Sequence, residues 1–115
     1  METNYEIDSL LTRLRSITLA PSFSRSEALL VLKNLLLWLN KPENNSDKNC
    51  RKVDYFVANE IITNKKYHEL PEDIKGILFD MGATLHDTHN SPRVAENFYS
   101  TPAQLLERIQ KLINQ

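Results

Sequence analysis

The most apolar stretch of the chain runs from Ser24 to Asn40, SRSEALLVLKNLLLWLN, and only two residues between positions 28 and 39 are polar. A helix with this pattern is apolar on nearly its whole circumference, which predicts a position inside a core with neighbours packed around it. Ser24 and Glu27 have the spacing of a capping box and mark its start. It is too short to span a bilayer, which needs about 20 apolar residues.

Apolar residues recur at helical intervals in five further segments. They predict helices over residues 3–19, 46–62, 71–90, 92–98 and 102–113, with a turn or short helical piece at 63–70. Thr3 with Glu6 and Thr101 with Gln104 repeat the capping-box spacing. The residues expected to be buried are Ile7, Leu10, Leu11, Leu14 and Ile17; Cys50, Val53, Val57 and Ile61; Ile74, Ile77, Leu78, Met81 and Leu85; and Leu105, Leu106, Ile109, Leu112 and Ile113.

The segment over residues 46–62 has two interpretations. Val53, Tyr55 and Val57 alternate with other residue types, and the segment is rich in residues that favour strands. The spacing 50, 53, 57, 61 nevertheless extends over three helical turns, and no partner strand is evident. We therefore predict a helix and keep a strand over residues 51–58 as the alternative.

Glycine and proline support a helical fold. The chain has two glycines and five prolines, and two glycines cannot supply the tight turns of an all-β sandwich. Gly76 and Gly82 both fall inside the helix predicted at 71–90, where each costs about 1 kcal/mol relative to alanine. We expect both to allow close packing against another helix. The prediction is an all-α single domain over residues 1–115, a bundle of about five to six helices around the apolar helix 24–40.

Length, net charge and cysteine content indicate the cellular compartment. The 115 residues are enough for one core, and the formal net charge of −1 gives no general attraction to nucleic acid or to an anionic membrane. Cys50 is the single cysteine, so no internal disulfide can form and a reducing compartment fits. The opening residues METNYEID lack the pattern of a secretory signal. We expect a cytoplasmic protein.

Residues 77–88, ILFDMGATLHDT, resemble the first motif of the haloacid-dehalogenase-like phosphatases. The resemblance implies that a strand delivers Asp80 as the nucleophile and that Thr84 is the threonine of the motif, while Gly82 replaces the usual general acid. Only 35 residues follow Asp80, without a βαβ pattern or room for the lysine and metal-binding acids that phosphoryl transfer needs. Helical spacing explains the same residues, and we do not expect an enzyme.

The sequence also contains candidates for a metal site and for a reactive cysteine, and we expect neither to be functional. His86, Asp87 and His89 contain one pair at the three-residue spacing of helical metal ligands, but a histidine at a helix end also interacts with the last carbonyls. We therefore expect no metal and no cofactor. Cys50 has basic neighbours that would activate an exposed thiol, yet a free cysteine is more often a small buried hydrophobe.

Acidic residues concentrate between positions 69 and 87, where five acids accompany one base. Three of them are seven residues apart and would lie along one stripe of a helix. This pattern fits either a solvated face or an acidic surface for a basic partner. The candidate partner-binding residues are Glu69, Glu72, Asp73, Asp80 and Asp87.

A small, cytosolic, all-helical protein with an acidic face and no catalytic set resembles bacterial immunity proteins, including those of contact-dependent growth inhibition systems. The resemblance covers overall character and no diagnostic motif. It implies a protein, monomeric when free, that neutralises a cognate toxin domain, often a nuclease with a basic cleft. The alternative is a helical adaptor or regulatory subunit with an exposed apolar groove.

Overall fold

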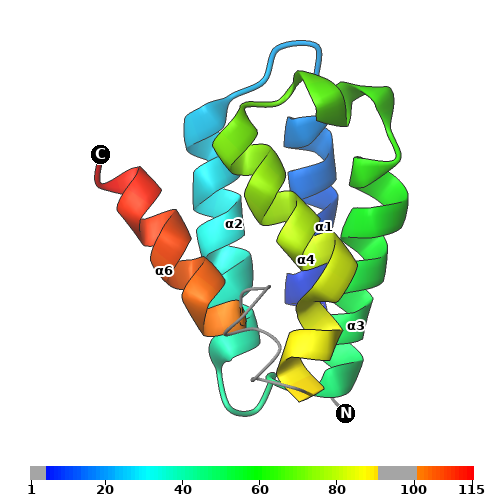
Figure 1. Ribbon diagram of the computed structural model, residues 1–115, viewed down its shortest axis with the longest axis vertical. Coiled ribbons are helices and arrows are strands. Elements are labelled where there is room, and N and C mark those ends of the chain that lie inside the picture. Colours follow the sequence, from blue (N-terminus) through cyan, green and yellow to red (C-terminus); the bar gives the residue numbers. More distant parts are fainter. Residues whose placement is uncertain (1–4, 91–100) are drawn as a thin grey trace.

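The computed structural model describes residues 5–90 and 101–115, apart from the side chains of residues 83, 84 and 86–90. The described residues form a helical bundle without any β-strand (Figure 1), so the all-α prediction is confirmed. The predicted helix over 92–98 and the predicted cap at Thr3 lie outside the described residues. The elements are α1 (Tyr5–Thr18), α2 (Arg25–Asn40), α3 (Asp47–Phe56), η1 (Val57–Ile62), η2 (Lys65–Glu69), α4 (Glu72–Asn90) and α6 (Pro102–Ile113).

Side-chain caps set the start of three helices. Thr101 and Gln104 form the complete capping box predicted for α6, with backbone-to-side-chain distances of 2.9 and 3.2 Å. Ser46 caps α3 through its side chain. At α2 the Ser24 hydroxyl accepts a bond from the Glu27 amide at 3.4 Å, and of the predicted capping box only this half is formed. These local bonds satisfy amides that the helical ladder leaves unpaired.

The segment from Asp47 to Ile62 is helical throughout, so the strand alternative over residues 51–58 is wrong. Its second half, η1, is a π-helix, a wider turn that occurs mostly in short pieces. Gly82 of α4 lies against this turn. A Cβ added there would lie 2.5 Å from Ile62 Cδ1 and 3.1 Å from the Ala58 amide nitrogen, which confirms the predicted close packing at this glycine.

The core lies between two groups of helices. The helix α2 packs against α1 and α6, while α4 packs against α3 and η1, and α1 also contacts η1 (Figure 1). Their apolar side chains form one buried cluster. Among the described residues α2 contributes most to it, including the fully buried Leu32, Leu35, Leu36 and Leu39.

One side of α2 faces solvent. Leu30 is 51% exposed and Leu37 is 40% exposed, with the exposed Asn34 between them. The expectation that this helix is covered on nearly its whole circumference is therefore wrong, because α1 and α6 flank α2 and leave this stripe uncovered. Ile113 of α6, predicted to be buried, is also 40% exposed. The other predicted core residues are buried or partly buried, the latter at Ile17, Leu106 and Leu112.

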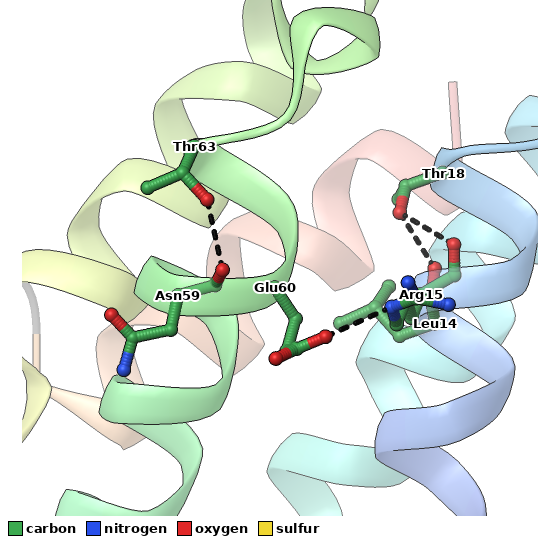
Figure 2. A network of polar contacts seen from close by, with 6 residues as sticks. All are labelled: Leu14, Arg15, Thr18, Asn59, Glu60 and Thr63. Carbon is green, nitrogen blue, oxygen red and sulfur yellow. Dashed lines mark hydrogen bonds and ion pairs between the residues drawn. The ribbon is translucent and has the colours of Figure 1, made fainter.

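Polar contacts join the end of α1 to η1 (Figure 2). Arg15 Nε donates to Glu60 Oε1 at 3.1 Å across the two elements. The buried Thr18 hydroxyl and the exposed Thr63 hydroxyl each donate at 2.8 Å to the carbonyl four residues before it. Such bonds satisfy carbonyls left open at helix ends. Within the described part of the chain, no helix is both long and apolar enough to cross a membrane.

Candidate functional site

Two of the predicted partner-binding acids connect α4 to other helices. Asp73 accepts two bonds from the Arg25 guanidinium of α2, at 2.9 and 2.6 Å. Asp80 accepts a bond at 2.7 Å from Arg108 of α6. The hydrogen bonds from Arg25 hold the pKa of Asp73 below its ordinary value, and the same pair raises the pKa of Arg25. Both acids therefore help to hold the bundle together.

The other two described acids form local ion pairs and extend into solvent. Glu72 lies 2.8 Å from Lys75 and its side chain is 90% exposed. Glu69 lies 3.7 Å from Lys66 and is also largely exposed. Exposed pairs of this kind contribute about 0–1 kcal/mol, so a competing cation can replace the lysine at little cost. Asp87 belongs to α4, but its side chain lies outside the described part of the structure.

Glu72 and Asp80 both line a surface hollow of about 350 Å³ between η2, α4 and α6. Tyr67 lines one side of this hollow. Its hydroxyl donates to the Lys75 carbonyl at 3.0 Å, which holds the ring against α4. Burial raises the pKa of the Tyr67 hydroxyl, and the negative charges of Glu72 and Asp80 raise it further against the opposing effect of Lys75. The residues lining the hollow are Tyr67, Glu72, Lys75, Gly76, Phe79, Asp80 and Arg108.

Phe79 is the residue of this site that the sequence analysis missed. Its ring is 50% exposed, although large aromatic side chains carry much of the energy of protein cores and interfaces. The signal was available in the sequence, because Phe79 is apolar but falls outside the stripe at residues 74, 78, 81 and 85. Position alone does not decide the outcome, because Ile77 is also off that stripe and is buried in the core.

Gly76 lies at the junction of this hollow and a second one of about 370 Å³ between α4 and α6. The two hollows share Glu72, Gly76 and Arg108. A Cβ added at Gly76 would have only Arg108 Nη2 nearby, at 3.8 Å, which is an ordinary contact. The close-packing explanation predicted for this glycine is therefore wrong. A side chain at position 76 would occupy space that the hollows leave open.

The phosphatase geometry is not found at Asp80. Residues 75–80 lie inside α4, so no strand delivers the Asp80 carboxylate, which bonds to Arg108 instead. Cys50 is fully buried, and burial, followed by the charges of Asp47 and Asp54, raises the pKa of its thiol to about 11. The thiol is protonated at neutral pH, and its interpretation as a core residue is confirmed.

Metal ligands are described for only part of the chain. Among the side chains that the structure places, no group of three or more histidine, cysteine or acidic residues could hold a metal ion. The side chains of His86, Asp87 and His89 are outside that set. The expectation that they form no metal site stays a prediction.

Comparison of the chain with protein-family models, with curated proteins and with solved structures finds no match. The functional interpretation therefore depends on the surface features themselves. The hollow beside Phe79 combines two ion pairs, Glu72 with Lys75 and Asp80 with Arg108, with an exposed aromatic ring and unfilled space.

Proposed function

We propose that this protein is a non-catalytic binding module of the bacterial cytoplasm, an immunity protein that binds and neutralises a cognate toxin domain. The observation that carries the proposal is the half-exposed Phe79 in a hollow that Glu72 and Asp80 also line. Aromatic side chains surrounded by polar groups are frequent anchors of protein interfaces. The Glu72 carboxylate at the edge of this hollow is 90% exposed, and an exposed carboxylate favours a basic protein surface as the partner.

The acids of α4 and η2 have different roles in this proposal. Asp73 and Asp80 of α4 are held by arginines of the bundle and keep the surface in one shape. Glu72 of α4 and Glu69 of η2 are exposed and pair with neighbouring lysines, which cations of the partner can replace at little cost. We therefore expect the partner to depend more on Glu72 than on Asp73.

The overall resemblance to immunity proteins suggests the class of partner. A nuclease domain has a basic cleft that binds phosphates, and carboxylates on α4 would occupy that cleft in place of the phosphates. The net charge of −1 gives the protein itself no long-range attraction to nucleic acid. Inhibition would follow from occupying the cleft, without a chemical step.

The test begins with affinity capture from the source bacterium, using the full chain as bait. The captured protein is then expressed alone and together with this protein, and growth is measured. We expect growth arrest alone and rescue on co-expression. Phe79→Ala combined with Glu72→Lys should weaken binding by at least about 30-fold, because truncation of an interface anchor costs about 2 kcal/mol or more.

Tyr55→Ala is the matched control, since Tyr55 of α3 is 51% exposed and does not line the hollow. It should leave rescue unchanged. The proposal fails if the captured protein is not toxic, or if rescue survives the double substitution at Phe79 and Glu72 while circular dichroism shows a folded variant.

A helical adaptor is the second candidate function. It is favoured by a separate observation, the exposed Leu30 and Leu37 on α2. An adaptor should bind its partner through this apolar stripe, and substitutions on α4 should then have no effect.

A further inference from the structure

The uncovered side of α2 is an apolar stripe with a polar centre. Leu30 and Leu37 are seven residues apart, which places them two helical turns apart on the same side. Asn34 lies exposed between them. The two half-exposed leucines give this helix face an apolar surface on which another molecule can pack.

A hollow of about 440 Å³ opens beside one end of the stripe, between α1 and α2. Leu10, Leu37 and Trp38 provide its apolar lining, and Asn34, Glu6 and Lys41 are at its edge. A leucine approaching along α2 would find an apolar recess at this position. The stripe therefore has both projecting leucines and a place to receive one.

The charges at the two ends of the stripe are opposite and evenly placed. Glu27 is exposed seven residues before Asn34, and Lys41 is exposed seven residues after it. Within the described residues, neither side chain forms an ion pair. A face with opposite charges at equal distances from its centre is complementary to its own antiparallel copy.

We propose that a second copy of this chain covers the stripe, with the two α2 helices antiparallel about a twofold axis near Asn34. In this arrangement Leu30 lies against Leu37 of the second copy, beside the recess at Trp38. Glu27 pairs with Lys41 of the second copy, and the symmetry repeats each contact. Asn34 faces Asn34 of the second copy, where a polar pair fixes the register.

The opposite orientation is disfavoured by the same residues. A parallel pair would place Glu27 against Glu27 and Lys41 against Lys41, and like charges at close range repel. The pairing surface shares no lining residue with the hollow beside Phe79, so this inference does not depend on the proposed toxin partner. It replaces the sequence-based expectation of a monomer.

The test measures the mass of the full chain by sedimentation and light scattering between about 1 and 500 μM, the range where weak dimers dissociate. We expect a concentration-dependent dimer. Leu30→Asp should raise its dissociation constant at least about 100-fold, because a carboxylate replaces an apolar contact and the symmetry repeats the loss in both copies. Tyr55→Asp, at the matched exposure of 51%, should leave the dimer intact.

Charge exchange tests the orientation. Glu27→Lys and Lys41→Glu should each weaken the dimer roughly tenfold, as expected for partly exposed charge pairs repeated by symmetry. An equimolar mixture of the two variants restores both opposite-charge contacts in an antiparallel heterodimer, and so does the double variant with itself. Both should dimerise as the wild type does.

Three results would overturn the proposal. The wild-type chain could stay monomeric up to about 500 μM, a range that detects even weak pairing. Folded Leu30→Asp could dimerise like the wild type, which would place the contact on another face. The mixture of charge variants could fail to recover, which would exclude the antiparallel register.

Discussion

Gly82 and Gly76 lie six residues apart in α4 and have opposite surroundings. At Gly82 a methyl group would meet Ile62 and the backbone of η1, whereas at Gly76 it would enter open space beside Arg108. Both glycines cost the helix about 1 kcal/mol relative to alanine. At Gly82 this cost is offset by a close helix contact, whereas at Gly76 no contact within the described structure compensates for it.

The two sides of α4 differ in packing in the same way as the two glycines. On the side of Gly82, the helix packs directly against α3 and η1. On the side of Gly76, the described contact with α6 includes the Asp80–Arg108 ion pair, and hollows remain around it. One side of α4 is thus part of the core, and the other has unfilled space and charged side chains at the surface, where we propose that a partner binds.

The largest effect is expected at the packed glycine. Gly82→Ala forces a Cβ into contact with Ile62 and the Ala58 backbone, and overpacking typically costs 1–3 kcal/mol, less the propensity gain. Against a propensity gain of about 1 kcal/mol, this leaves a net loss of up to about 2 kcal/mol and a lower melting temperature. Thermal and urea unfolding would measure it. A gain of the full propensity effect, about 1 kcal/mol, would contradict the close approach of α4 to η1.

Gly76→Ala should have the opposite effect on stability. The added methyl meets only an ordinary contact, so the helix should gain about 0.5–1 kcal/mol from propensity. The same unfolding experiment should show a higher melting temperature, and affinity for the partner should fall because the hollow is smaller. A destabilised Gly76→Ala would mean that both glycines are packed alike.

The smallest effect is expected at the start of α4. Arg25 lowers the pKa of Asp73, so the ionised Asp73 carboxylate stabilises the folded state. This stabilisation is fully present above the ordinary pKa of 3.8, and it is lost as the pH falls through the lower pKa of the folded state. Asp73→Asn should cost less than about 1 kcal/mol at pH 7, since the pair is partly exposed. It should also flatten the loss of stability below about pH 4.

Arg25→Gln is the matching variant for this pair, because it removes the cation and keeps the acid. It should flatten the acid part of the unfolding profile in the same way as Asp73→Asn. Different profiles for the two variants would show that Asp73 draws its low pKa from another group.

Helix positions were predictable because their signals are local. The cap at Thr101 and the spacing of Ile74, Leu78 and Met81 each involve residues within one or two turns, and the structure confirms them. The short helical piece at η2 was predicted in the same way. Periodicity identifies the side of a helix that is apolar, and this suffices for an all-α fold.

The site was less predictable because it depends on contacts between distant residues. Asp73 meets Arg25 across 48 positions and Asp80 meets Arg108 across 28, so the sequence shows the acids without their partners. Gly82 lies against the π-helical turn η1, a contact between segments about 20 residues apart that local spacing does not report. The exposed Leu30 reflects the number of helices beside α2, which periodicity does not report.

The separation of the α2 stripe from the hollow on α4 has a consequence for stoichiometry. Since no residue lines both surfaces, the proposed toxin domain and the proposed second copy would not compete for the same side chains. The paired protein would then be bivalent and bind two toxin domains. Against toxins that are themselves tethered together, such an inhibitor gains avidity from effective concentration without any additional contact.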